Sequence, residues 1–177
     1  MLENFKYTDK EIDEIVKSLT VLVDTREKDN RHILDYFTKK NIPFKKKALS
    51  QGDYSFYIPK NDSLSIARDY YFDKEVCIER KGSLEEVSSN LSQQRDRFEK
   101  ELSIYKGNMI LLIENANYSD IIDGKYKTQY NKKSFWASLH SFWFRYKIPF
   151  EFMPNRDYSG VFIRGMFTYY LKNKLHK

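Results

Sequence analysis

Hydrophobic positions in the first half of the chain fall into short periodic segments. Residues 8–19 open with a capping box, Thr8 and Glu11, and continue with apolar residues at helical spacing. We therefore expect a short amphipathic helix that packs outside the main domain. The run TVLVD at 20–24 predicts a buried strand that ends on an acid. A second amphipathic helix is expected at 30–40, where Ile33, Leu34 and Phe37 share one face. It should end before Asn41-Ile42-Pro43, because the residue that precedes a proline disfavours helical angles.

Strand patterns occupy the middle of the chain. A basic segment at 44–49 leads to Gln51-Gly52-Asp53, after which apolar and polar residues alternate through Ile58, as in a half-buried strand. Residues 59–65 (PKNDSLS) predict a turn, and the pattern of 66–73 is ambiguous. The apolar run that ends in Glu79-Arg80-Lys81 predicts a buried strand at 75–81.

The second half alternates strand and helix patterns. Ser83 is positioned to cap one long helix that reaches residue 105, and the apolar run at 109–113 predicts a central parallel strand. A helix at 134–146 and a strand at 149–153 follow. A final helix starts at Asp157 or Ser159, and its tail KNKLHK is expected to fray. This alternation predicts one α/β domain at 20–177 after an N-terminal helical extension at 1–19.

Composition adds weak limits on the class of protein. The 177 residues carry a net charge of +6, which favours a polyanionic partner such as DNA only modestly. Cys77 is the single cysteine, so a disulfide within the chain and a cysteine zinc cage are excluded, and a small buried hydrophobe is the simpler interpretation. The N-terminus is polar, and no apolar run approaches the length of a membrane span. We expect a soluble, intracellular protein of the cytoplasm or nucleoid.

The charges at the end of the strand at 75–81 suggest chemistry. Side chains two apart on a strand share a face, so Glu79 and Lys81 project together while Arg80 points the opposite way. Asp24 and Asp53 each lie at the edge of a predicted strand. Three such acids could bind a divalent metal, with the amine of Lys81 near an attacking water, as phosphodiester hydrolysis requires. The simpler alternative is an exposed cross-strand ion pair and two solvated turn acids.

These residues resemble the XPF-type (xeroderma pigmentosum group F) nuclease family. The family pattern V-x-V-D-x-R-E, G-D and E-R-K-x-x-x-D is matched by 21–27 (VLVDTRE), by Gly52-Asp53 and by Glu79-Arg80-Lys81, in the predicted order. The later segments MILLIE and FWASLHSFWFRYKIPFEFM are similar to the family's strand, helix and strand. Three ordered motifs are far more specific than any one of them.

The resemblance implies a restriction-endonuclease-like fold, in which helices flank a mixed central sheet. It implies that Asp24, Asp53 and Glu79 bind Mg²⁺ or Mn²⁺, that Lys81 is the catalytic lysine, and that Arg26 and Arg80 are active-site arginines. The family's final aspartate corresponds to Glu85, with Glu86 beside it. Its arginine before an aromatic corresponds to Arg97, with Arg95 as the alternative.

The implied function is endonucleolytic cleavage of DNA, in branched structures such as a flap, a fork or a Holliday junction, or in ordinary duplex. A catalytically silent DNA-binding or scaffold subunit is the rival.

The chain has no tandem helix-hairpin-helix modules and resembles compact versions encoded by bacteria and phages. The long segment between Asp53 and Glu79 is expected to be a surface insertion. A homodimer is expected through 134–146 and the final helix. Candidate DNA contacts are Lys45, Lys46, Lys47, Lys125, Lys127, Lys132 and Lys133.

Overall fold

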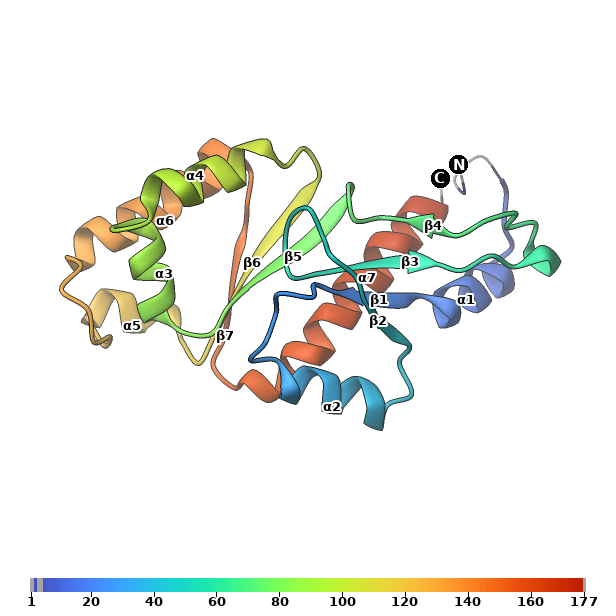
Figure 1. The fold of residues 1–177 in the computed structure, drawn as a ribbon, viewed down its shortest axis with the longest axis horizontal. Coiled ribbons are helices and arrows are strands. Elements are labelled where there is room, and N and C mark those ends of the chain that lie inside the picture. Colours follow the sequence, from blue (N-terminus) through green and yellow to red (C-terminus); the bar gives the residue numbers. More distant parts are fainter. Residues whose placement is uncertain (1, 3–4, 177) are drawn as a thin grey trace.

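The computed structural model describes residues 2 and 5–176 and contains one mixed seven-stranded sheet (Figure 1). The strand order is β2-β1-β3-β5-β6-β7, and β4 pairs with β3 outside this path. The strands β5, β6 and β7 are parallel, whereas β3 runs antiparallel to both β1 and β5. The bounds are β1 Thr20–Val23, β2 Phe44–Lys46, β3 Tyr54–Ile58, β4 Tyr70–Tyr71, β5 Val76–Lys81, β6 Asn108–Glu114 and β7 Phe150–Met153.

Helices cover the two faces of the sheet as separate layers. One hydrophobic core lies under α1, α2 and α7, and a second lies under α3, α4, α5 and α6. Alternate residues of β5 and β6 enter opposite cores, since Ile78 and Leu112 belong to the first and Cys77 and Leu111 to the second. The bounds are α1 Asp9–Ser18, α2 Arg31–Lys39, η2 Asp62–Leu64, α3 Leu84–Leu91, α4 Arg95–Ile104, α5 Tyr118–Asp123, α6 Lys132–Tyr146, η3 Arg156–Tyr158 and α7 Ser159–Leu175.

The sequence patterns predicted most of these elements. The apolar run of β6 lies between β5 and β7 in the parallel part of the sheet, and α/β architecture is confirmed. Helix α6 begins two residues before the predicted start because the side chain of Asn131 accepts hydrogen bonds from the backbone of Lys133 and Ser134. Strand β2 and helix α5 were not predicted. The first is a lysine-rich edge strand and the second has only six residues.

Helix α1 begins with the predicted capping box, but its packing differs from the prediction. Ile12, Ile15 and Leu19 are fully buried and belong to the same core as β1 and α7. The guanidinium of Arg164 in α7 donates hydrogen bonds to the carbonyls of Val16 and Leu19. The expected packing outside the main domain is therefore wrong.

The single long helix predicted after Ser83 is two helices. Helix α3 ends at Leu91, the backbone of Ser92 leaves helical geometry, and α4 starts at Arg95. The hydroxyl of Ser92 donates to the carbonyl of Ser88, a local bond that competes with helix propagation. After the break, α4 turns towards the start of β6, the next strand of the sheet (Figure 1).

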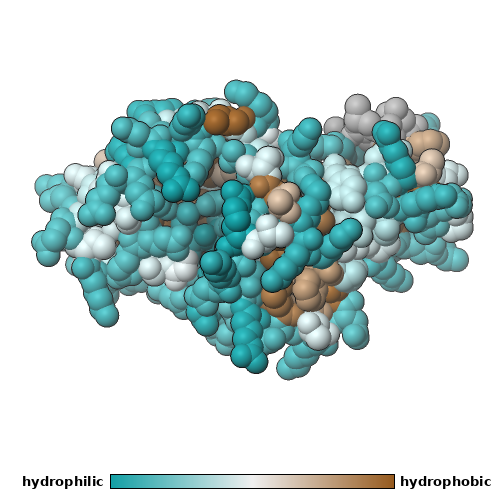
Figure 2. All heavy atoms as spheres, viewed as in Figure 1, coloured by the Kyte–Doolittle hydropathy of each residue, from teal (hydrophilic) through white to brown (hydrophobic). Residues whose placement is uncertain are grey.

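Two further expectations need correction. The segment between β3 and β5 is not a bare surface insertion, because Leu64, Ile66 and Phe72 are buried in the first core. The tail does not fray at the start of KNKLHK either. Helix α7 continues to Leu175, and the ammonium of Lys174 pairs with Glu75. Within the described residues no helix has the length and apolar character that crossing a membrane requires. Figure 2 shows a mainly hydrophilic surface on the viewed face, with hydrophobic atoms gathered near β2 and α2.

Candidate active site

The carboxyl end of β5 presents its charges to both faces of the sheet. Glu79 and Lys81 project towards α3 and α4, as the alternation predicts, and the ammonium of Lys81 lies 2.9 Å from Oε1 of Glu79. Oε1 of Glu86, in the first turn of α3, lies 3.5 Å from the same ammonium. Lys81 is buried, so its charge depends on these two carboxylates for compensation.

Asp53 reaches the same region from the turn that precedes β3. Gly52 has a φ of 71°, and a Cβ at this position would lie 2.8 Å from Cβ and Sγ of Cys77, so only glycine fits. The backbone N–H of Asp53 donates to the carbonyl of Ile78 at 2.9 Å, and the backbone N–H of Arg80 donates to Oδ2 of Asp53 at 2.7 Å. These bonds fix the Asp53 carboxylate beside the end of β5.

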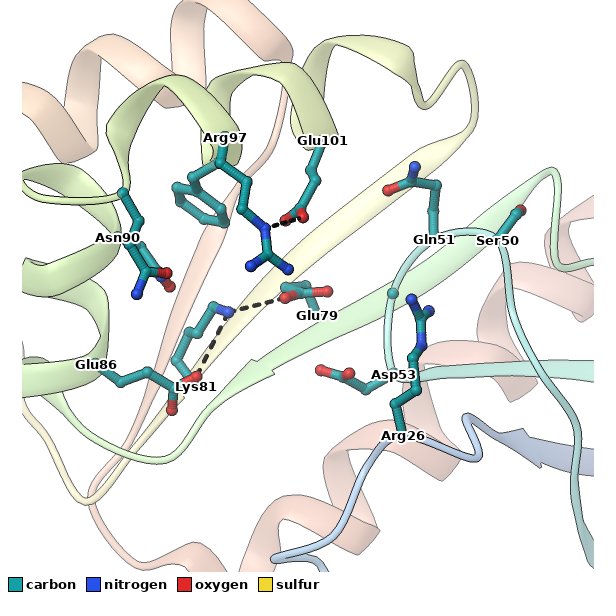
Figure 3. Close-up of a pocket in the computed structure, with 13 residues that line it drawn as sticks. Arg26, Ser50, Gln51, Asp53, Glu79, Lys81, Glu86, Asn90, Arg97 and Glu101 are labelled. Atoms are coloured by element: carbon teal, nitrogen blue, oxygen red, sulfur yellow. Dashed lines mark hydrogen bonds and ion pairs between the residues drawn. The ribbon is translucent and has the colours of Figure 1, made fainter.

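A cavity of about 400 Å³ opens between these two strand ends and the helices α3 and α4. Figure 3 shows Asp53, Glu79 and Lys81 facing into it from the sheet, with Arg97 and Asn90 on the helical side. Arg26 enters from the segment after β1 (Figure 3). Asp24 and Arg80 do not line the cavity.

The acids and the amine in the cavity have shifted pKa values. Burial and the nearby Glu79 carboxylate raise the pKa of Asp53 to about 8. For Lys81, burial lowers the pKa, but Glu79 and Glu86 outweigh burial, so the net pKa is raised. Lys81 is therefore a fixed positive charge near neutral pH, and the negative charge of Asp53 is poorly compensated.

Asp24 lies outside this arrangement. Its side chain is 1% exposed, and both of its oxygens are occupied by donors from the chain. Oδ1 accepts from the backbone N–H and Nε of Arg26, and Oδ2 accepts from Nη2 of Arg26 and the backbone N–H of Leu49. Burial raises the pKa of Asp24, but these hydrogen bonds outweigh burial and lower it overall. Asp24 thus fixes Arg26 at the edge of the cavity, and the structure does not bring the three predicted acids together.

The guanidinium of Arg80 points to the opposite face, as the alternation predicts. It lies under α2, where it pairs with Glu27 and with Oε2 of Glu114, the latter at 2.7 Å. Oε1 of Glu114 lies 2.8 Å from Nε2 of His32. All four side chains are buried or nearly so, which anchors the end of β5 from behind the cavity.

Of the other predicted DNA contacts, one lines the cavity and the rest lie elsewhere. Arg97 lines the cavity, is 78% exposed and pairs with Glu101. Arg95 instead packs α4 on α6, through Ser138 and the ring of Phe142. None of the candidate lysines lines the cavity. Lys45 and Lys46 lie in the edge strand β2, and Lys47 directly follows it. Lys125 and Lys127 precede α6, and Lys132 and Lys133 form its start.

The family pattern places its final acid at Glu85, but Glu86 is the glutamate of the first turn of α3 that lines the cavity. Oε2 of Glu86 accepts from the backbone N–H of Gly82 at 2.8 Å, and the residue lines the cavity. Oε1 of Glu85 accepts from the backbone N–H of Lys127 and faces away. The sequence analysis did not identify Asn90 and Gln94, which also line the cavity. Their spacing of four along the chain, with Glu86 four residues earlier, was the available signal.

The fit of a divalent metal rests on Asp53 and Glu79. Among the described residues no group of three acidic, histidine or cysteine side chains is close enough to hold an ion. Two carboxylates are nevertheless sufficient for Mg²⁺, which keeps several waters and takes other ligands from substrate phosphates. The raised pKa of Asp53 indicates unbalanced negative charge at this point. A cation bound here would balance that charge, so the residues fit a divalent metal.

The sequence and the fold are similar to those of known proteins. A sequence model of the ERCC4 domain matches residues 23–166. No curated protein matches the sequence. The structure is similar to that of XPF from Aeropyrum pernix, with a TM-score of 0.59 and 15% identity over 85% of this chain and 61% of that chain. For XPF from Aeropyrum pernix in complex with DNA, the TM-score is 0.63 and the identity 16%, over 87% of this chain and 66% of that chain. The chain thus spans about three fifths of the first matched structure, and the restriction-endonuclease-like fold is confirmed.

Proposed function

Because the chain belongs to the ERCC4 domain family, which is a family of nucleases, we propose that it is a Mg²⁺- or Mn²⁺-dependent endonuclease that hydrolyses phosphodiester bonds in branched DNA. The observation that carries this proposal is the meeting of Asp53, Glu79 and Lys81 in one cavity at neighbouring strand ends. The matched structure of XPF in complex with DNA supports DNA as the substrate.

Each residue of the cavity has a role that follows from its position. Asp53 and Glu79 would hold the metal, which supplies an activated water and neutralises charge on the transferring phosphate. Lys81 remains protonated, so it stabilises the non-bridging phosphate oxygens and orients the water rather than accepting a proton from it. Arg26 is 71% exposed and is held by Asp24 at the edge of the cavity, where it can bind a phosphate of the same strand.

The proposal is tested by cleavage of end-labelled fork, flap, four-way junction and plain duplex DNA in Mg²⁺, Mn²⁺ or EDTA. Wild-type protein should cut a branched substrate faster than duplex, and only with metal. Glu79→Gln should lower the rate by at least about 100-fold, the scale of losing a charge-stabilising group. Glu85→Gln is the matched control, because Glu85 faces away from the cavity and should leave cleavage unchanged.

The rival function, a silent DNA-binding subunit, predicts different results. Wild-type protein would then bind branched DNA without cutting it in either metal, and Glu79→Gln would not alter its behaviour. The presence of both carboxylates and a buried lysine in one cavity favours the active enzyme, because a buried charged cluster costs stability that a scaffold has no need to sacrifice.

We also infer that the protein forms a homodimer through α6 and α7. Their surfaces carry large apolar side chains that are at least 40% exposed, and a second copy that covered them would remove this apolar area from water. These residues are Trp136, Trp143 and Phe144 on α6 and Val161 and Tyr169 on α7. Sedimentation at micromolar concentration should give twice the mass of the chain, and a monomer there would exclude the dimer.

A further inference from the structure

A second hollow lies next to the active-site cavity. The cavity and this hollow share Ser50 and Gln51 in their linings, so they are neighbours at the loop that precedes Asp53. Figure 3 shows Ser50 and Gln51 at the margin of the cavity opposite Asn90 and Glu86. The hollow has a volume of about 280 Å³, and we call it the side groove.

The floor of the side groove is apolar and rigid. Ile104, the last residue of α4, is 54% exposed beside Tyr105. The hydroxyl of Tyr105 donates to the carbonyl of Asp73 at 3.4 Å, which ties its ring to the segment before β5. A Cβ at Gly107 would lie 2.7 Å from the Tyr105 hydroxyl and 2.6 Å from the carbonyl of Glu75, so the turn after α4 is closely packed against β5. The exposed apolar surface is therefore held in place.

Two cations flank this apolar floor. Lys74 and Lys106 both line the side groove and are exposed. Neither forms an ion pair with any residue in the described part of the chain. An apolar platform between unpaired lysines is the arrangement that binds an unpaired nucleic-acid strand, since bases stack on the platform and phosphates bind the cations. With a volume of about 280 Å³, the groove has room for a small group such as one base and not for a duplex.

We propose that the side groove holds an unpaired nucleotide of the DNA strand that is cut, next to the scissile phosphate. This inference rests on the proposed nuclease function, and it adds which residues of this chain bind the unpaired part of the substrate strand. Its base contacts Ile104 and Tyr105, and its flanking phosphates contact Lys74 and Lys106.

The first test measures binding rather than cleavage. In the Glu79→Gln background, the triple change Lys74→Ala, Ile104→Ser and Lys106→Ala is compared by fluorescence anisotropy on a labelled single strand and a blunt duplex. Single-strand binding should weaken by about tenfold or more, because one apolar contact to the base and two lysine–phosphate contacts are lost, and duplex binding should change less than about twofold. The slope of log affinity against log salt should fall by about 1.4, because each lysine–phosphate contact contributes about 0.7 on a single strand.

A matched control variant carries the same three kinds of substitution at positions outside the side groove. Ile122 on α5 is 46% exposed, and Lys10 and Lys17 on α1 are exposed, so Ile122→Ser with Lys10→Ala and Lys17→Ala removes the same groups far from the groove. This control should bind both DNAs like the Glu79→Gln parent. The proposal is overturned if the groove variant binds the single strand within about twofold of its parent, or if the control loses as much affinity.

The second test uses cleavage by the protein with Glu79 intact. Branched substrates are shortened so that the cut strand ends next to the scissile phosphate, on one side or on the other. KM is measured for wild type and for the groove variant on each truncated substrate. One truncation removes the nucleotide that the groove binds, so on that substrate the two proteins should have the same KM. On the other substrate the difference in KM should remain. If both truncations leave that difference unchanged, the groove is not a strand site. If wild type cuts no DNA with metal, the proposed function fails, whereas the binding test still decides the groove.

Discussion

Replacing Asp53 with asparagine should stabilise the protein above neutral pH while abolishing cleavage. The carboxylate is buried beside Glu79, which raises its pKa from 3.8 to about 8. Asparagine keeps an oxygen that can accept the 2.7 Å hydrogen bond from the backbone of Arg80. The substitution therefore removes a poorly compensated negative charge with little change in the local structure.

The sign of the pH dependence follows from where the proton is held. Between pH 4 and pH 8 the folded protein keeps the Asp53 proton and the unfolded chain releases it, so stability falls as the pH rises. A pKa difference of one unit is worth about 1.4 kcal/mol. A pKa raised to about 8 thus sets an upper limit of about 6 kcal/mol on the loss at alkaline pH. Water penetration and relaxation reduce this, and we expect a difference of about 2–4 kcal/mol between pH 5 and pH 8.

Urea denaturation in EDTA at pH 5, 6, 7 and 8 measures this difference directly. The gap in unfolding free energy between Asp53→Asn and wild type should widen steadily with pH in favour of the variant. Asp35→Asn removes an exposed carboxylate of α2 and is the control for a general charge effect. At pH 8, Mg²⁺ at 100 times its dissociation constant should stabilise wild type by about 2.7 kcal/mol and leave Asp53→Asn unchanged. A gap that stays constant with pH would refute the reasoning.

Three further predictions follow from the packing. Gly52→Ala should destabilise the protein by about 2–4 kcal/mol in urea, because alanine disfavours the left-handed φ and overlaps Cys77. Adding Cys77→Ala should recover part of that loss, and no recovery would exclude the overlap as a cause. Glu114→Ala should cost about 3–5 kcal/mol in the same assay, since it removes one carboxylate from the buried guanidinium of Arg80; a cost below about 1 kcal/mol would show that the pair is dispensable. Phe144→Ser should shift sedimentation from dimer to monomer without lowering the melting temperature, and a variant that stays dimeric would remove this residue from the interface.

Elements of the fold were predictable where the sequence pattern reflects the burial of side chains. They were not predictable where a side-chain hydrogen bond competes with the hydrogen bonds of a helix. Strand β6 is buried on both faces and therefore reads as an unbroken apolar run, which identifies a central parallel strand. The break between α3 and α4 has no such signal, because the apolar positions Leu91 and Phe98 are seven apart and fit one continuous helix. At the break the hydroxyl of Ser92 donates to the carbonyl of Ser88, which competes with helix propagation, and the periodicity of apolar residues does not report that bond.

Side-chain directions at the cavity were also predictable from the sequence on the strand but not on the helix. Along a strand the spacing is rigid, so the opposite directions of Lys81 and Arg80 follow from the sequence alone. Which acid of α3 faces the cavity depends on the phase of the helix, and neighbouring positions differ by about 100° around its axis. Because Ser83 caps α3 and the backbone of Gly82 binds Glu86, that acid turns towards Lys81, and Glu85 turns towards Lys127. A motif that counts residues from the strand therefore selects Glu85, which faces Lys127, whereas the cap of α3 turns Glu86 towards the amine of Lys81.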